Sequence, residues 1–467
     1  MKNYNKETQN DIIESFLMDS IGRNKLLFNF IKFISKIQEN EILAINGTWG
    51  SGKTYFIKQF ELLINFINNY DEKGNIINSE LKTNNLQCLK NINKEQINSL
   101  NTLISENKEN LRELFASNTT NCLYFNAWEY DNNNEPILSI LYKIIKDFPY
   151  LSTYIKNTEF KKITSIIDGI SLTLSNGNFK ASDYCSSKNL IDAINTSESI
   201  KEQINNIFKK LLEENSNKMI IVIDELDRCN PIYAIKLLEE IKHYINNRNI
   251  IIILTTNIQQ LSNTIKNIYG NKFQVDEYLD KIIDFTFSLP QINKTEYVKN
   301  NIGLESFKSN NWFSNVIFAY IKYRKLEMRS INRFVTLMRL YENHIYLENN
   351  RTDKGQKLLE YIFLPYCIGE QIFKSNNYAE FTRGSGYEEF YEYINSDQKL
   401  KNIVDNCIYS VAYREEKDLK KDLETLYNSI YNQSNDSFVI NIGDIEINTL
   451  DIKYYFDLST MLSDFLM

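Results

Sequence analysis

Histidine is almost missing from this chain, which has only His243 and His344 among its 467 residues. Two histidines so far apart do not form an ordinary zinc cluster, because such sites draw several ligands from closely spaced positions. The six cysteines are also widely scattered, with no C-x-x-C pair and no secretory leader. We therefore expect reduced thiols and a cytoplasmic protein.

Long apolar runs are absent as well. The nearest approach, from Ile163 to Leu174, falls short of the roughly 20 residues that cross a bilayer, and it contains Asp168. We therefore expect no transmembrane segment. The formal net charge of −7 gives no clear sign of nucleic-acid binding.

Glycine is scarce too, yet three of the 14 glycines fall within one stretch of eight residues. This stretch has the G-x-x-x-x-G-K-[ST] pattern of a phosphate-binding loop at every fixed position. The apolar segment 41–46 before it is typical of a buried strand, and apolar residues at helical spacing follow it. The loop consists of Gly47, Thr48, Trp49, Gly50, Ser51, Gly52, Lys53 and Thr54, with Tyr55 directly after it.

A loop of this kind binds the phosphates of a nucleotide, here expected to be ATP. Backbone N–H groups and the positive end of the following helix point at phosphate oxygens. We expect Lys53 to reach the β- and γ-phosphates and the Thr54 hydroxyl to bind Mg²⁺. The alternative, a chance glycine-rich turn, is disfavoured by the strand and the helix on either side.

A second motif closes the apolar strand predicted over 219–223. We expect Asp224 at the strand end to orient a water or another ligand on Mg²⁺, opposite Thr54. Glu225 is the candidate general base that polarises the attacking water. In the turn that follows, Asp227 and Arg228 are expected to form a local ion pair, and Cys229 to be a small core residue.

Further strands are predicted over 122–126, 250–254 and 285–289, each separated from the next by helical patterns. Such alternation predicts an α/β fold with a parallel sheet covered by helices on both faces. Nucleotides bind at the carboxyl ends of strands in such sheets. Asn257, shortly after the strand over 250–254, is a candidate for holding the attacking water or sensing the γ-phosphate.

The pattern becomes mainly helical after Pro290. Arg329 and Arg333 lie one turn apart, on the face opposite an apolar stripe. A two-residue Gly443-Asp444 turn predicts a hairpin near the C-terminus. Three parts are predicted: a P-loop domain over 1–290, a helical domain over 291–395, and a C-terminal region over 396–467 with helices and the hairpin. Within the P-loop domain we expect helices at 8–38, polar insertions at about 69–118 and 150–187, and a helix over about 189–213.

Three stretches together are similar to the KAP family of P-loop NTPases. They are the phosphate loop with its internal Trp49, the segment Phe125-Asn126-Ala127-Trp128-Glu129, and the segment from Asp224 to Pro231. The resemblance extends over about residues 10–345 and includes Arg329 and Arg333. Many family members carry transmembrane helices inserted in the NTPase domain, whereas the insertions here are polar.

The resemblance implies ATP hydrolysis coupled to a conformational change, with an extra strand between the two nucleotide-binding strands. It also implies a role in bacterial defence against phage, and a protein partner or self-assembly. By the same resemblance, Arg333 is a candidate for a γ-phosphate contact, with a solvated helix face as the alternative. Lys281 lies where related ring ATPases carry a residue that reaches the nucleotide of a neighbouring subunit. The alternative for Lys281 is a solvated side chain.

Three functions stay open from the sequence. The first is an ATPase that works as a switch, the second a nucleotide-binding scaffold with weak hydrolysis, and the third a small-molecule kinase. Glu225 directly after Asp224 favours attack by water, and the chain has no arginine-rich lid segment, so a kinase is the least favoured. For Trp128, a place in the core and a place in the active site are equally compatible with the sequence.

Overall fold

The chain forms two compact units, Met1–Ile292 and Asn293–Met467, in a computed structural model. The predicted insertion at 150–187 and the predicted helix over 189–213 lie outside the described residues. The structure describes residues 8–77, 88–89, 92–106, 111–114, 120–133, 136–148, 218–244, 249–294, 297–298, 311–346, 354–373, 385–409, 418–431, 439–448, 450–452, 454 and 457.

The first unit is built on a five-stranded parallel sheet with the order β2-β3-β4-β1-β5. The predicted α/β fold with a parallel sheet is therefore confirmed. β4 separates β1, which leads into the phosphate loop, from β3, which ends in Asp224, as the family resemblance implies. The strands are β1 (Ile42–Asn46), β2 (Thr120–Asn126), β3 (Lys218–Asp224), β4 (Ile250–Thr256) and β5 (Phe285–Ser288).

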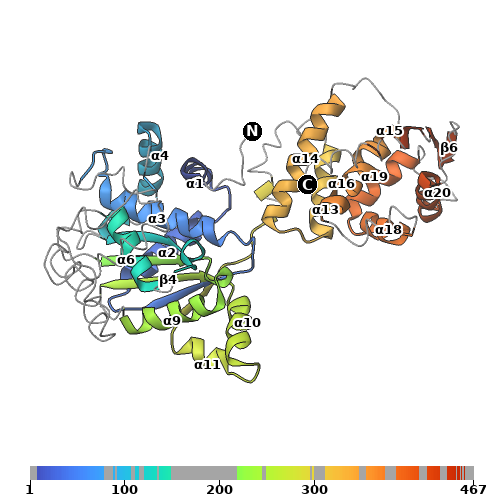
Figure 1. The fold of residues 1–467 in the computed structure, drawn as a ribbon. Coiled ribbons are helices and arrows are strands. Elements are labelled where there is room, and N and C mark those ends of the chain that lie inside the picture. The colour runs from blue at the N-terminus through green and yellow to red at the C-terminus, as the bar shows by residue number, and fades with distance from the viewer. Residues whose placement is uncertain are drawn as a thin grey trace, which may run out of the picture. The chain divides into compact units, whose positions relative to one another are not determined.

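Helices cover both faces of this sheet (Figure 1). One face carries α1 (Gln9–Leu17), α2 (Asn24–Lys36) and α3 (Lys53–Asn69), and the other carries α9 (Pro231–Tyr244), α10 (Ile258–Tyr269) and α11 (Val275–Asp280). Because both faces are covered, every residue of β4 is buried and five of its seven residues are isoleucine or leucine. The first unit also contains α4 (Lys94–Ser105), α5 (Leu111–Leu114), α6 (Pro136–Asp147) and two short turns, η2 (Ala127–Tyr130) and η6 (Leu226–Arg228).

The second unit is mainly helical, as predicted. A β-hairpin also forms there, with antiparallel strands joined by the Gly443-Asp444 turn, where Gly443 has a φ of 59°. This hairpin was predicted from the turn residues. The elements are α13 (Asn311–Tyr323), α14 (Met328–Tyr346), α15 (Lys354–Leu358), the π-helical turn η8 (Leu359–Phe363), α16 (Leu364–Ile372), α18 (Tyr387–Asn395), α19 (Gln398–Ile408), α20 (Leu419–Tyr431), β6 (Val439–Ile442) and β7 (Ile445–Asn448).

A fully buried carboxylate is satisfied inside the second unit. Glu370 of α16 accepts hydrogen bonds from the Tyr320 hydroxyl at 2.9 Å and from Arg324 Nε at 2.6 Å. Tyr320 in turn packs edge-on against Tyr366 and Tyr393. A buried charge needs such partners, so this network specifies how α13 and α16 pack.

Helix α14 is amphipathic as predicted. Arg329 and Arg333 are exposed, and the buried face consists of Ile331, Phe334, Val335 and Met338. Within the parts of the chain that the structure describes, none of the helices has the length and apolar character needed to span a membrane.

Candidate nucleotide site

The phosphate loop joins the end of β1 to the start of α3, at the carboxyl edge of the sheet. Gly52 caps α3 with a φ of 82°, a left-handed conformation that glycine adopts without steric cost. A Cβ on Gly47 would lie 2.6 Å from Ser51 Oγ, so the loop also closes on itself too tightly for a side chain there. The Gly47 N–H donates to the Thr256 carbonyl at 3.3 Å, which ties the loop to the end of β4.

Lys53, the first residue of α3, lies folded into the loop. Its Nζ donates to the carbonyls of Gly47 at 2.6 Å and Thr48 at 3.1 Å, and the residue is only 9% exposed. Burial lowers the pKa of Lys53, while the charges of Asp227, Asp224 and Glu225 oppose that shift. A cation is thus held inside a ring of backbone groups, where a phosphate would meet it.

Asp224 ends β3 with its carboxylate almost fully buried, at 1% exposure. The Tyr124 hydroxyl donates to Oδ2 at 2.9 Å, the Glu225 N–H donates to Oδ1 at 2.9 Å, and the Thr255 hydroxyl also donates to Oδ1. These donors fix the orientation of the carboxylate. Two neighbouring strands, β2 and β4, therefore position the acid that β3 supplies.

Glu225 has a left-handed backbone, with a φ of 62°, which is uncommon for a residue with a side chain. Its Oε2 lies 2.6 Å from Arg228 Nε in an ion pair that is mostly buried. The guanidinium of Arg228 also lies over the Trp128 ring, 5.8 Å from its centroid. The predicted ion pair between Asp227 and Arg228 is therefore wrong, because Arg228 pairs with Glu225 instead.

Asp227 pairs with the phosphate loop. The indole Nε1 of Trp49 donates to its Oδ2 at 2.6 Å, so the loop is tied to the turn after β3. Trp49 and Trp128 are both about half exposed, at 51% and 53%. The interpretation of Trp128 as a core residue is therefore wrong. Cys229 is buried, as predicted.

The other predicted site residues are placed as follows. Thr54 and Tyr55 lie half-buried in the first turn of α3. Asn257 follows β4 and caps α10, where its side chain accepts the Gln260 N–H at 3.4 Å, so its role toward water or phosphate stays a prediction. Arg333 lies in the second unit, and its contact with nucleotide also stays a prediction. Lys281 is exposed at the end of α11, which agrees with a solvated side chain.

For two polar residues of the site, the contact with Asp224 was not predicted from the sequence. Tyr124 was interpreted only as part of the strand over 122–126, and Thr255 only as a polar residue after the strand over 250–254, yet both hydroxyls hold Asp224. The available signal was a polar side chain near the end of an otherwise apolar strand. For a third residue, Arg23, the sequence contains no signal of a role at the site.

The model of the KAP family P-loop domain matches residues 23–345, which is more than half of the chain. The chain belongs to the KAP family of P-loop NTPases. This KAP protein thus falls among proteins that bind and hydrolyse nucleoside triphosphates. Comparison with curated proteins gives no match to the chain.

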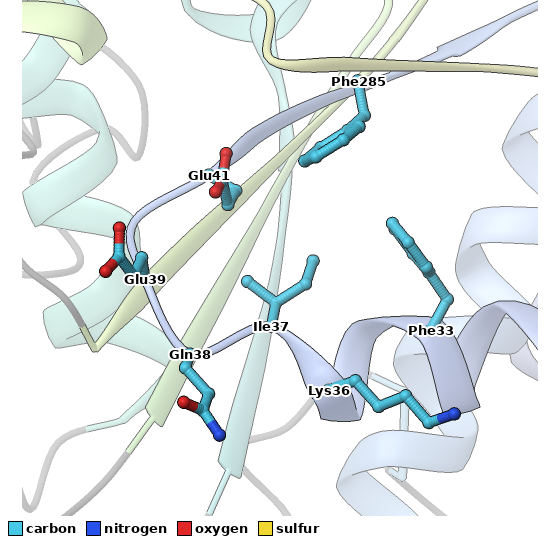
Figure 2. A pocket seen from close by; sticks show the side chains of 7 residues that line it. All are labelled: Phe33, Lys36, Ile37, Gln38, Glu39, Glu41 and Phe285. Atoms are coloured by element: carbon cyan, nitrogen blue, oxygen red, sulfur yellow. The ribbon is translucent and has the colours of Figure 1, made fainter.

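A separate cavity of about 250 Å³ lies at the opposite edge of the sheet, before β1 (Figure 2). Phe33 and Phe285 meet edge to face there, with ring centroids 6.0 Å apart. Because Glu41 precedes β1 while the phosphate loop follows it, this cavity is not part of the nucleotide site. Its lining residues are Phe33, Lys36, Ile37, Gln38, Glu39, Glu41 and Phe285.

Proposed function

We propose that this KAP protein binds ATP with Mg²⁺ in the phosphate loop, hydrolyses it, and uses the cycle as a conformational switch. One observation carries the proposal. Lys53 is held within the loop by two backbone carbonyls, near Asp224, the last residue of β3, and Glu225, the residue after it. A cation inside a phosphate-binding loop, beside two carboxylates, is the arrangement that a metal-bound triphosphate requires.

The residues present suit Mg²⁺, which prefers oxygen ligands. Thr54 would supply a hydroxyl and Asp224 a carboxylate whose orientation Tyr124 and Thr255 already fix. When bound, the ion would neutralise charge on the β- and γ-phosphates. Lys53 would bind the same phosphates through its positive charge.

Glu225 is proposed as the general base that takes a proton from the attacking water. In the structure its carboxylate is paired with Arg228 at 2.6 Å. The base must leave this ion pair, at least in part, before it can accept a proton. This pairing favours slow basal hydrolysis, so a nucleotide-binding scaffold with weak turnover is the second candidate function.

Binding of ATP is tested directly by calorimetry with Mg²⁺ and a slowly hydrolysed ATP analogue. Lys53→Ala removes the positive charge that would contact the β- and γ-phosphates. We therefore expect the affinity for the analogue to fall by about 100-fold or more. Lys25→Ala removes an exposed lysine at the start of α2 and serves as the matched control. Equal affinity of the folded Lys53→Ala protein and the wild type would refute the phosphate-loop assignment.

Membership of the KAP family supports extending the proposal to defence against phage. The experiment is to express the protein in a bacterial host and measure phage plaque counts. Protection should depend on Lys53 and Glu225 if the nucleotide cycle drives it. Equal protection by the wild type and by Lys53→Ala would separate any defence role from nucleotide binding.

A further inference from the structure

A buried arginine contacts the phosphate loop. Arg23, the residue before α2, is only 5% exposed. Its Nη1 donates to the Ser51 carbonyl in the loop at 2.8 Å, and its Nη2 donates to the Pro290 carbonyl. One guanidinium thus joins the loop to the chain that follows β5.

This position is unfavourable for a purely structural cation. Burial lowers the pKa of Arg23 to about 10, which still leaves it charged at neutral pH. Among the described residues, Nε has no hydrogen-bond partner and no carboxylate shifts this pKa. Asp19 lies close but accepts the backbone N–H groups of Arg23 and Asn24 instead. Arg23 also caps the positive end of α2, where the helix dipole disfavours a cation.

The chain that Arg23 binds leads out of the first unit. We call residues 289–292 the exit segment, since Ile292 is the last residue of the first unit and Asn293 begins the second. A Cβ on Gly52 would lie 3.3 Å from Ile292 Cδ1 and 3.4 Å from Arg23 Nη1. The phosphate loop, Arg23 and the exit segment are therefore packed in mutual contact.

We propose that Arg23 is a positioning residue that couples a triphosphate in the phosphate loop to the exit segment, and that the triphosphate supplies the negative charge that this buried cation lacks. The proposal rests on the proposed binding of ATP. The negative charge of the phosphates stabilises the Arg23 guanidinium in the position where it donates hydrogen bonds to the Ser51 and Pro290 carbonyls. Coupling is reciprocal, so a fixed exit segment also raises the affinity of the loop for the triphosphate.

The test is hydrogen–deuterium exchange of peptides covering residues 285–293, with and without Mg²⁺ and a non-hydrolysable ATP analogue. In the wild type the analogue should slow exchange in the exit segment by about fivefold or more, a typical size for coupling between sites. Arg23→Met keeps the length of the side chain and removes the charge. This variant should lose that protection and bind the analogue about fivefold to tenfold more weakly.

Arg23→Lys separates charge from bridging. An ammonium keeps the charge but lacks the planar fork that reaches two carbonyls at once. Affinity for the analogue should stay within about threefold of wild type, while protection of the exit segment should fall by at least half. Ile292→Ala is a milder variant, because Ile292 is only half-buried, and it should also weaken the protection.

Arg112→Met is the matched control for loss of a carbonyl-binding arginine. Arg112 donates to the carbonyls of Ile67 and Tyr70 and to Asn101 Oδ1, at the far end of α3 from the phosphate loop. Burial lowers its pKa as well. This variant should lower the melting temperature and leave affinity and exit-segment protection unchanged.

Two results would overturn the proposal. One is a wild type that binds the analogue with no change of exchange in the exit segment, which would leave ATP binding itself intact. The other is an Arg23→Met protein with wild-type affinity and wild-type protection. A wild type that binds no nucleotide would instead refute the proposed function on which the coupling rests. If Arg23→Met does not fold, Arg23→Lys and Ile292→Ala decide the question.

Discussion

Glu225, the proposed general base, has an unusual backbone conformation. Its backbone is left-handed, and its carboxylate pairs with Arg228, three residues on. Strain of this kind, of order 1–3 kcal/mol, persists where the surroundings hold it. Around Glu225 those surroundings are the Asp224 carboxylate, which accepts its N–H, and the Arg228 guanidinium.

Glu225→Gln should stall hydrolysis and leave Mg-ATP bound. Loss of a general base typically costs about 10²–10⁴-fold in rate, while Lys53, Thr54 and Asp224 still hold the nucleotide. Phosphate release in steady state measures the rate, and calorimetry measures binding. Turnover within about threefold of wild type would reassign the base, with Asp227 as the next candidate.

Arg228→Gln should raise basal hydrolysis by about fivefold, since it frees Glu225 from a partly exposed ion pair of roughly 1 kcal/mol. Arg228→Lys keeps a charge near Glu225 and is the control, expected to stay near wild type. Phosphate release at saturating Mg-ATP is the measurement. A fall in turnover for Arg228→Gln would show that the arginine assists the reaction instead of restraining the base.

At the scale of elements, α3 carries a buried acid two turns after Lys53. Burial raises the pKa of Glu61 to about 8, and nearby Lys143 of α6 only partly offsets this. Lys143 itself pairs with Asp147 at 2.6 Å. The contact of α3 with its neighbours therefore includes a carboxyl that is more protonated in the folded than in the unfolded chain.

This carboxyl should make stability depend on pH. Because the folded pKa lies above the unfolded value, Glu61 contributes its full stability below the unfolded pKa and loses it as pH rises through about 8. We expect the free energy of unfolding to fall by about 1–2 kcal/mol between about pH 6 and about pH 8.

Glu61→Gln should flatten that part of the pH profile, because the amide does not ionise. Chemical unfolding at several pH values, followed by circular dichroism, is the measurement. Glu14→Gln, an acid on α1, is a control and should keep the wild-type slope. An unchanged slope in Glu61→Gln would show that another group titrates.

At the scale of the whole molecule, the question is how the helical unit responds to nucleotide. Arg329 and Arg333 share the exposed face of α14, opposite the buried stripe that contains Phe334 and Met338. A guanidinium is always charged and can donate two hydrogen bonds to phosphate oxygens. Such a pair is suited to detect the γ-phosphate.

Arg329→Ala and Arg333→Ala test this sensor role. At least one variant should lose the preference for ATP over ADP, or lose hydrolysis by about tenfold or more, with little change in melting temperature without nucleotide. A structural role would instead lower the melting temperature and keep the preference. If both variants match the wild type in discrimination and turnover, the arginines belong to a solvated face.

Patterns in the sequence were enough to predict the parallel sheet, the phosphate loop and the mainly helical second unit. Strand and helix patterns depend on the local spacing of apolar residues, and the loop depends on glycines close together in the chain. The Gly443-Asp444 hairpin followed from turn chemistry in the same way. These features need no knowledge of distant partners.

The contacts between polar groups in the site, by contrast, follow from the packing of distant segments. Neighbouring strands bring Tyr124 and Thr255 to Asp224 across about 100 and 31 positions of sequence. In the turn after β3, Arg228 forms an ion pair with Glu225, and Asp227 accepts a hydrogen bond from Trp49. Arg23 reaches Pro290 across 267 positions. Such pairings depend on side-chain directions in three dimensions, and no local pattern in the sequence encodes them.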